Sequence, residues 1–293
     1  MQSQFLLPKS CSTFTRSILL GMLFTLWTFT FSTAQSAPQQ QLDWNTETVV
    51  KGIVWKSLHT DRLFSSWQNI NVLEIDNKLH PVSIAYSDEL LYPTSHFGQN
   101  SAAIAAVNGG FFDMRDGGSV TIMKVNGTVV TENNTTKNPE VMRSSLILNQ
   151  AGQLRIEPFR PLKEVTGNSA YHTVFVTGPI LVQNSQKISL TPERKFNTYR
   201  HPRTCACTTA DDKLLLITVD GRRPEAAEGM TLTELANFSL LLGCVDTINL
   251  DGGGSTTMWI AGKPQNGVVN MPSDNGVFDQ KGERSVANVL LVY

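Results

Sequence analysis

The strongest constraint on the fold of this chain is a run of three glycines, 252–254, one residue after an apolar segment at 245–250. The apolar segment predicts a buried strand. Glycine does not continue a packed strand well, because it has no side chain and loses the most entropy on folding. One carboxylate precedes the glycines and three hydroxyl residues follow them, in the order NLDGGGSTTM. Backbone N–H groups in such a loop can closely approach an anion. We therefore interpret the loop as a site rather than as a simple turn.

Residues 1–34 have the pattern of a secretory signal. A basic stretch precedes an apolar run over 18–31, and small residues precede the expected cleavage after Ala34. The run is too short for a comfortable membrane span of about 20 residues. We expect an exported protein, periplasmic or secreted, with a linker over 35–48 and one domain over 49–293. After cleavage we expect no stable membrane span.

The charge balance argues against some partners. Beyond residue 34 the chain carries 22 basic and 25 acidic residues, a weak excess of negative charge. Proteins that bind nucleic acid or anionic membranes usually carry a basic patch. We therefore expect no nucleic-acid partner, and the sequence leaves the oligomeric state open.

Three cysteines follow the signal. Cys205 and Cys207 alternate on one predicted strand, so they share a face and are poorly placed to bridge each other. Either could pair with Cys244 if the two strands are neighbours, and three buried thiols are the alternative. Because no fourth soft ligand lies nearby, a zinc site is not expected. The sequence predicts no metal and no cofactor.

Short strands dominate the predicted secondary structure. Apolar or alternating runs recur between polar breaks, and Asn126-Gly127 joins two of them as a hairpin turn. One helix is well signalled, because Thr231 and Glu234 form a capping box before an apolar face. We predict a single α+β domain with a mixed or mostly antiparallel sheet and a few packed helices.

Four other strand ends carry glycine, arginine or carboxylate residues. They are NGGFFD (108–113), HPRT (201–204), DGRR (220–223) and ER (283–284). Taken singly, each fits an ordinary turn or a solvated surface charge. Taken together they are harder to dismiss, because loops at strand ends commonly carry binding and catalytic groups.

These segments carry a resemblance to a known family. In chain order, NGGFFD, HPRT, DGRRPEAAEGMTLTELA, NLDGGGSTTM and ERSVANVLLV resemble the phosphodiester glycosidase family over about residues 102–293. The resemblance implies hydrolysis of a sugar–phosphate diester that releases the sugar and leaves a phosphomonoester. It implies a substrate in the cell envelope or an exopolysaccharide and does not fix the sugar, for which N-acetylglucosamine is one candidate.

Asp251 and Asp220 are the candidate catalytic residues. Cleavage of an anomeric C–O bond passes through an oxocarbenium-like state that two carboxyl groups usually assist. Both residues end apolar strands, which would partly desolvate them and tune their pKa values. A phosphate leaving group is already acidic, so one carboxylate could suffice. The sequence does not say which of the two would be the acid and which the nucleophile.

The candidate substrate-binding residues supply cations, backbone N–H groups and hydroxyls. Guanidinium groups pair with the phosphate, Asn108 and Asp113 could bond sugar hydroxyls, and at most one of Phe111 and Phe112 would serve as a sugar platform. His201 could act as acid or base, or could position other groups. The full set is Asn108, Gly109, Asp113, His201, Arg203, Thr204, Arg222, Gly252, Gly253, Gly254, Ser255, Thr256 and Arg284.

Two alternatives stay open. A metal-dependent phosphodiesterase could use scattered aspartates as oxygen ligands, although D-x-D and H-x-x-x-H spacings do not occur. A non-catalytic protein that binds phosphosugars or polysaccharide would use the same arginine and glycine loops. A serine hydrolase built on Ser255 is disfavoured, because the G-x-S-x-G elbow is missing.

Overall fold

The computed structural model describes residues 42–132 and 143–293. The predicted signal segment, 1–34, lies outside this part. The first strand begins at Asn45, inside the linker predicted over 35–48. The folded domain therefore starts earlier than the sequence suggested, because a strand of mostly exposed residues lacks the apolar pattern by which strands are recognised.

The largest unit is an eight-stranded sheet with the strand order β1-β2-β3-β15-β14-β16-β12-β13. Its neighbouring strands are paired antiparallel, which confirms the prediction of a mostly antiparallel sheet. Its strands are β1 (Asn45–Val50), β2 (Ile53–Leu63), β3 (Ser66–Asp76), β15 (Lys213–Val219), β14 (Arg203–Thr209), β16 (Cys244–Asn249), β12 (Ile180–Gln183) and β13 (Gln186–Lys187).

Three smaller antiparallel sheets accompany the large one. The five-stranded sheet comprises β10 (Leu154–Pro158), β9 (Ser144–Leu148), β11 (Thr173–Thr177), β7 (Met123–Val125) and β8 (Thr128–Thr131). The four-stranded sheet comprises β17 (Met258–Ile260), β6 (Ala105–Asn108), β19 (Asn288–Val292) and β4 (Val82–Tyr86). The last pairs β18 (Ser285–Val286) with β5 (Tyr92–Pro93). The expected hairpin at Asn126-Gly127 joins β7 to β8.

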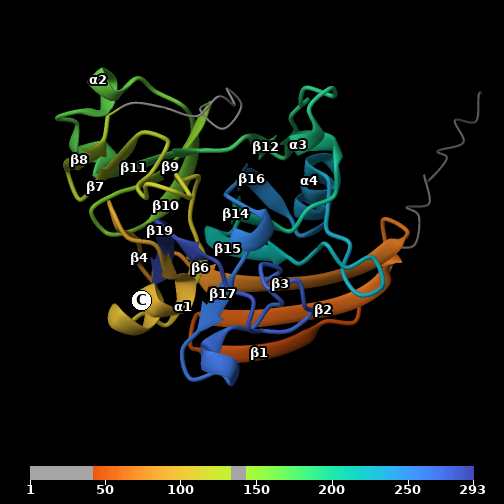
Figure 1. The fold of residues 1–293 in the computed structure, drawn as a ribbon. Helices are drawn as coiled ribbons and strands as arrows, with labels where there is room; N and C mark the ends of the chain where they lie inside the picture. Colours follow the sequence, from red (N-terminus) through yellow and green to blue (C-terminus); the bar gives the residue numbers. More distant parts are fainter. Residues whose placement is uncertain (1–41, 133–142) are drawn as a thin grey trace, which may run out of the picture. The chain divides into compact units, whose positions relative to one another are not determined.

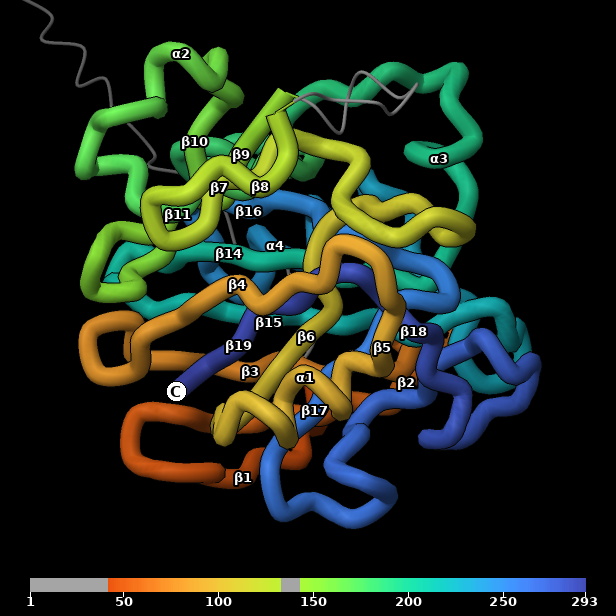
Figure 2. Tube along the Cα trace, turned by 60° about the vertical axis from the view of Figure 1, so that its left-hand side comes forward, coloured from red at the N-terminus to blue at the C-terminus, as the bar shows by residue number. Residues whose placement is uncertain are grey.

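The central strands of the large sheet are buried on both faces, whereas β1 and β13 are mostly exposed. On β15, Leu214 and Leu216 belong to the core shared with the four- and five-stranded sheets. The alternate residues Leu215 and Ile217 belong to the core that includes helix α4, as the two-residue period of a strand requires. Figure 1 shows β1, β2 and β3 side by side, with α4 and the five-stranded sheet in separate parts of the domain. Figure 2 shows α1 close to β6 and β17.

Helix α4 (Leu232–Leu241) forms where its cap predicts. Thr231 accepts a hydrogen bond from the Glu234 amide, and the Glu234 side chain bonds back to the Thr231 amide. The other helices are shorter: α1 (Thr94–Asn100), α2 (Leu162–Val165), α3 (Lys195–Thr198), and the 3-10 turns η2 (Ser169–Tyr171), η3 (Gly253–Ser255) and η4 (Gln265–Gly267). Across the described ranges, no helix is both long and apolar enough to cross a bilayer.

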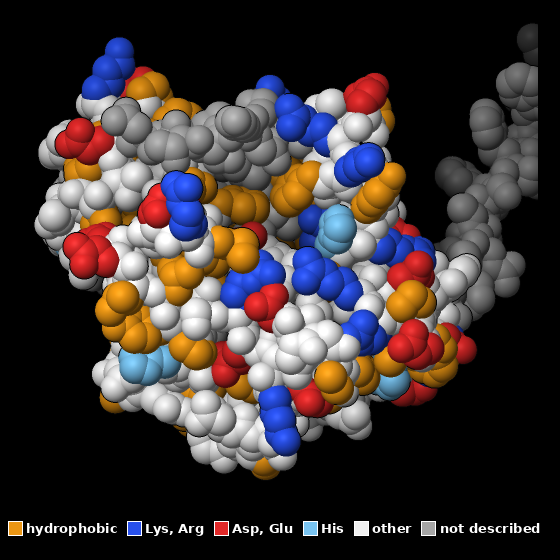
Figure 3. All heavy atoms as spheres, in the orientation of Figure 1, with side chains coloured by type: hydrophobic (Ala, Val, Ile, Leu, Met, Phe, Trp, Pro, Cys, Tyr) orange, Lys and Arg blue, Asp and Glu red, His pale blue; other side chains and the backbone are white. Residues whose placement is uncertain are grey.

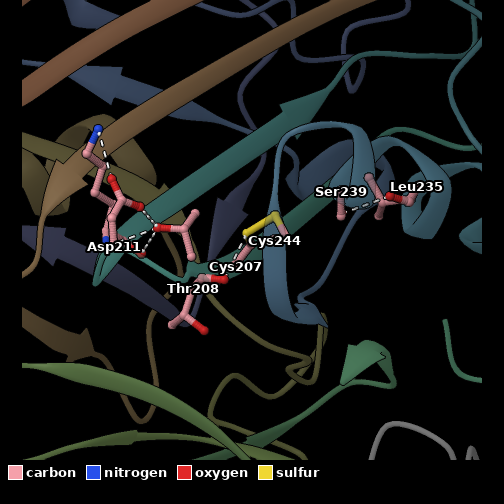
Figure 4. The surroundings of a disulfide bond; sticks show 8 residues. Cys207, Thr208, Asp211, Leu235, Ser239 and Cys244 are labelled. Carbon is pink, nitrogen blue, oxygen red and sulfur yellow. Dashed lines mark hydrogen bonds and ion pairs between the residues drawn. A yellow bond between two sulfur atoms is a disulfide. The ribbon is translucent and has the colours of Figure 1, made fainter. Parts of the chain in front are cut away.

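One disulfide joins β14 to β16 beneath α4 (Figure 4). It links Cys207 to Cys244, with the Cα atoms 5.8 Å apart, and leaves Cys205 as a buried free thiol. Both β14 cysteines face the core that contains α4, as their alternation predicts. The register settles the choice that the sequence left open, because Cys205 lies opposite Asn249, farther from Cys244 than Cys207 is.

Candidate functional site

The glycine-rich loop after β16 is held by a buried asparagine on β6. Asn108 donates through Nδ2 to the Asp251 carbonyl at 2.7 Å, and its Oδ1 accepts from the Thr257 amide at 3.1 Å. The Thr204 hydroxyl also donates to this Oδ1, at 2.7 Å. The Asp251 amide in turn donates to the Gly109 carbonyl at 3.0 Å. The polar atoms of Asn108 are thus used within the protein, and they fix the loop in place.

A second buried asparagine supports the loop from its other side. Asn270 donates through Nδ2 to Asp220 Oδ1 at 2.7 Å and to the Thr256 carbonyl at 3.0 Å, and its Oδ1 accepts from the Met258 amide at 2.8 Å. This side chain therefore connects the glycine loop to the carboxylate that ends β15. The two candidate aspartates belong to one hydrogen-bonded framework.

Asp220 lies deep in that framework. It is 1% exposed, and its Oδ2 accepts from Asn69 Nδ2 at 2.6 Å and from the Met271 amide at 2.9 Å. Burial raises the pKa of Asp220 to about 6, and these hydrogen bonds act in the opposite direction. Because both carboxylate oxygens accept N–H groups, the side chain is well placed to hold β3, β15 and the 270–271 segment together.

Asp251 is more open. It is partly buried at the start of the loop, and burial raises its pKa to about 6. The Ser255 hydroxyl, the Gly252 amide and the charge of Arg284 act to lower the pKa of Asp251. A carboxyl with a pKa near 6 can change its protonation close to neutral pH, as catalytic carboxyls often do.

Two guanidinium groups lie against the glycine backbone. A Cβ atom added to Gly253 would lie 2.8 Å from Arg222 Nη2, and one added to Gly254 would overlap both Arg284 and Asp274. Any larger residue would therefore displace these side chains. Arg284 pairs with Asp274, with Nε at 3.0 Å from Oδ1. On the face of the molecule that Figure 3 shows, Lys and Arg side chains gather near the centre, with a carboxylate and a histidine beside them.

The backbone of Arg222 adopts a left-handed conformation with φ +66°. This region is costly for residues with a Cβ atom. The Arg222 side chain is exposed, and the hydrogen bond that it makes is a long one of 3.4 Å from Nη1 to Ser273 Oγ. Within the described ranges, no carboxylate forms an ion pair with it. An exposed cation on a strained backbone is a typical feature of a binding site.

Arg203 lies in a different environment from the one that the sequence suggested. It is 2% exposed, with Nε bonded to the Met230 carbonyl and Nη2 to the carbonyls of Phe196 and Tyr199. Burial lowers the pKa of Arg203 to about 10. Its guanidinium also lies 5.2 Å from the centre of the Phe196 ring. The structure thus brings Arg222 and Arg284 to the loop and directs Arg203 into the protein.

The hydroxyl residues of the loop also face inward. Ser255, Thr256 and Thr257 are fully buried, and within the part of the chain that is described the hydroxyls of Thr256 and Thr257 have no hydrogen-bond partner. Ser255 lies close enough to Asp251 to lower its pKa. The sequence predicts that Ser255 and Thr256 bind the substrate, and the structure buries both side chains.

His201 and Asp113 lie at the margins of the site. His201 is partly buried and pairs through its backbone with Met230, and its pKa is lowered by burial and by the charges of Arg203 and Arg222. Asp113 Oδ1 accepts from the amides of Arg115 and Asp116, which lowers the pKa of Asp113. The observed hydrogen bonds of Asp113 therefore stabilise a local turn.

Aromatic side chains flank the loop. Phe111, directly after Gly110, is partly exposed and lies 6.1 Å from Phe196 between ring centres. Phe112 instead packs against the core that includes α1. Of the two phenylalanines in NGGFFD, Phe111 is therefore the one that does not pack against that core.

Four residues that matter here were missed from the sequence: Asn69, Asn270, Ser273 and Asp274. Asn69 lies inside an ordinary strand pattern, and the other three follow an irregular stretch with no recognisable motif. The only signal was the density of Asn, Ser and Asp over 270–275, which reads equally well as a loop. As for metals, no group of three or more His, Cys, Asp or Glu side chains that could hold an ion is found in 42–132 and 143–293.

The chain is similar in sequence to a known mouse protein. The mouse N-acetylglucosamine-1-phosphodiester alpha-N-acetylglucosaminidase is 27% identical over 182 residues, which is 58% of this chain and 33% of the mouse protein. The chain thus spans about a third of the length of that relative.

Two solved structures share the fold. The catalytic domain of the zebrafish N-acetylglucosamine-1-phosphodiester alpha-N-acetylglucosaminidase superposes with a TM-score of 0.64 at 18% identity, over 88% of this chain and 85% of that one. A hypothetical protein from Synechocystis gives a TM-score of 0.62 at 13% identity, over 86% and 64%. The family model described as phosphodiester glycosidase matches residues 101–293, and the chain therefore belongs to the phosphodiester glycosidase family.

Proposed function

We propose that this protein is an exported hydrolase that cleaves the bond between the anomeric carbon of a sugar and a phosphodiester oxygen. Membership of the family supports glycosidase action on phosphodiester sugars. The observation that carries the proposal is the position of Asp251. Asp251 directly precedes the glycine loop, and the guanidinium groups of Arg222 and Arg284 lie against the backbone of that loop.

In this proposal the phosphate binds beside Gly253 and Gly254. Arg222 supplies a cation without a carboxylate partner in the described chain, and Arg284 adds a second whose charge Asp274 partly offsets. A phosphodiester carries one negative charge, with which the exposed guanidinium of Arg222 can pair. Guanidinium groups and backbone N–H groups together are a common combination for phosphate.

The chemistry centres on Asp251. Its ionised carboxylate, the main form above pH 6, faces the anomeric carbon and stabilises the positive charge that develops there. The C–O bond breaks, its electron pair stays on the phosphate oxygen, and a phosphomonoester leaves. Water then supplies the hydroxyl group of the released sugar, and its other proton passes to the released phosphomonoester. Because the phosphomonoester is a good leaving group, this step requires little help from an acid.

We assign Asp220 a positioning role rather than the catalytic role that the sequence suggested. Its two oxygens accept three N–H groups, and the side chain has almost no exposed surface. Arg203 and Asn108 receive structural roles for the same reason, since their polar groups are occupied within the protein. Phe111 is the sugar platform, because it is partly exposed and follows the glycine pair beside Asp251.

Export is part of the proposal. The first 34 residues have the signal pattern, and a disulfide between Cys207 and Cys244 is typical of oxidising compartments such as the periplasm or the exterior of the cell. A substrate in envelope or extracellular polysaccharide is consistent with that location. N-acetylglucosamine is one candidate for the released sugar, since it is part of the name of the mouse relative.

The test is a hydrolysis assay with the purified protein. Methyl phosphodiesters of common α-sugars and UDP-N-acetylglucosamine are followed by NMR for release of sugar and phosphomonoester in equal amounts. Asp251→Asn is expected to lose turnover but keep binding. Asp246→Asn, on the same segment of chain and five residues earlier, is the matched control and should stay active. Turnover that survives Asp251→Asn would refute the assignment of Asp251.

The same assay separates the alternatives. A non-catalytic phosphosugar-binding protein would bind one of these diesters without turnover, in wild type and in Asp251→Asn alike. That reading has support in the same cationic loop, which would serve binding equally well. A metal-dependent phosphodiesterase would lose its activity in a chelator and regain it with Mg²⁺ or Ca²⁺.

A further inference from the structure

Trp67 on β3, His59 on β2 and Phe278 in the 271–284 segment form an aromatic cluster. The cluster lies near the turn after β15 that carries Arg222. The His59 ring lies 5.0 Å from that of Trp67 and 6.2 Å from that of Phe278, measured between centres. Trp67 is 39% exposed. A large aromatic ring left open to solvent beside a polar site is a typical contact surface for a ligand.

The sheet register puts this cluster on the same side of the sheet as Asp220. Asn69 donates to Asp220, and Trp67 is two residues from Asn69 on the same strand. Alternate residues of a strand point to one face, about 6.6 Å apart. His59 is paired directly opposite Asn69. The aromatic rings are therefore one step along the sheet from the framework that holds the glycine loop.

The turn after β15 connects the cluster to the phosphate site. Arg222 contacts the glycine loop, and the next residue, Arg223, pairs through its backbone with Ala227. His59 Nε2 lies 2.9 Å from the Ala226 carbonyl, and the amide of Glu228 donates to the Trp67 carbonyl at 2.9 Å. Going outward from Asp251, the order is thus the glycine loop, Arg222, this turn, and then the aromatic rings.

From this order we propose that Trp67, His59 and Phe278 form a subsite for a neutral sugar ring, carried on the phosphate side of the cleaved bond. The proposal rests on the proposed function and extends it to a longer carbohydrate substrate. One face of a pyranose presents C–H groups, which pack against the electron-rich face of an indole ring. Trp67 and His59 lie outside residues 101–293, so two of the three rings belong to the part of the chain that the family model does not match, and Phe278 lies within the matched part.

An exposed carboxylate beside the cluster favours a neutral sugar over a nucleotide. Glu225 is exposed and directly precedes Ala226, whose carbonyl contacts His59, whereas Glu228 is paired with Arg200. Carboxylates accept hydrogen bonds from sugar hydroxyls, whereas they repel the second phosphate of a nucleoside diphosphate. The rings of His59 and Trp67 are also tilted by 40° rather than stacked as a slot for a flat base.

Binding of neutral oligosaccharides tests the subsite without requiring turnover. Chitotetraose, maltotetraose and cellotetraose are titrated into the full protein by calorimetry, with saturation-transfer NMR to identify the rings in contact. We expect at least one to bind, and Trp67→Ala to weaken that binding roughly tenfold. Tyr86→Ala is the matched control, because Tyr86 is 37% exposed on an edge strand of another sheet.

Each outcome decides the proposal. If Trp67→Ala does not fold, Trp67→Phe, which keeps a smaller ring, should give intermediate affinity, and His59→Ala should weaken binding too. Failure of all three tetrasaccharides to bind, or equal losses in the Trp67 and Tyr86 variants, would overturn the subsite. Binding of UMP that depends on Trp67, in place of sugars, would do the same. The hydrolysis of methyl diesters by the wild-type protein is scored separately, so failure of the activity and failure of the subsite are distinguishable.

Discussion

Replacing Arg222 by glycine should separate function from stability at one position. The residue has φ +66°, where a side chain with a Cβ atom costs about 1–2 kcal/mol. Glycine removes that cost and adds about 0.5–1 kcal/mol of entropy loss on folding. Alanine keeps the strain and removes the same guanidinium. We therefore expect Arg222→Gly to be about 0.5–1 kcal/mol more stable than Arg222→Ala.

The side chain itself contributes little to stability, because it is exposed and makes one hydrogen bond of 3.4 Å. Arg222→Gly should therefore melt at or slightly above the temperature of the wild type. The expected gap between the glycine and alanine variants is about 1–4 °C for a domain of this size. Differential scanning calorimetry of the three proteins measures it.

Activity should change in the opposite sense. A charge-assisted hydrogen bond to the substrate phosphate is worth about 1.5–3 kcal/mol, which corresponds to a loss of about 10- to 150-fold in kcat/KM. Both variants should lose this amount, since both lack the guanidinium. Arg222→Lys should recover part of it, because the charge returns without the forked geometry.

Three results would refute this reasoning. If the alanine variant is as stable as the glycine variant, the left-handed backbone is not a source of strain at this position. If either variant keeps wild-type kcat/KM on a methyl phosphodiester, Arg222 does not bind the phosphate. A loss of activity that follows the loss of stability in both variants would show a structural role only.

Three further predictions follow from the site and the fold. The pKa of Asp251 is raised from an ordinary 3.8 to about 6, so the folded state binds this proton more tightly than the unfolded chain does. The free energy of unfolding should therefore fall as pH rises from about 4 to about 6, by up to about 3 kcal/mol. Asp251→Asn should remove this pH dependence, so the free energy of unfolding of the variant minus that of the wild type should be larger at pH 7.5 than at pH 4, as measured by urea unfolding. The same difference at both pH values would contradict the raised pKa of Asp251. Asp274→Asn removes the carboxylate that pairs with Arg284 and should tighten the binding of methyl phosphate about tenfold in calorimetry; weaker binding would mean that Asp274 is needed to orient the arginine. Replacing both Cys207 and Cys244 by serine opens a link between residues 37 apart and should cost about 4 kcal/mol in the same urea assay, with a similar loss in wild type under reductant.

The features that the sequence predicted well are local ones. A capping box, an Asn-Gly turn and an apolar run that ends in glycines depend on neighbours within a few residues, so α4, the β7–β8 hairpin and the loop at 252–254 could be placed in advance. Strand alternation also fixed the shared face of the two cysteines on β14. These patterns carry their own physical cause within the segment that shows them.

The features that the sequence did not give depend on register between distant strands. Arg203 looks like a cation at the start of a strand, yet carbonyls from Phe196, Tyr199 and Met230 surround it in the fold. Asn270 matters because the chain brings it between Asp220 and the glycine loop, and its neighbours in sequence show no motif. Such contacts arise from tertiary packing, which a single sequence does not reveal.

The charge of Arg284 leads to a last prediction, about the pH dependence of catalysis. Arg284 lowers the pKa of Asp251 against the stronger effect of burial, and the balance leaves that pKa at about 6. If the ionised carboxylate is the active form, kcat/KM should rise with pH through about 6 and then level off. Arg284→Gln removes the opposing charge, so the midpoint of the rise should move to higher pH, while Arg115→Gln, which removes an exposed arginine paired with Asp116, should leave it in place. A profile of kcat/KM between pH 4.5 and 8.5 for the three proteins makes the comparison. A midpoint that does not move in Arg284→Gln would mean that the rise belongs to a group other than Asp251.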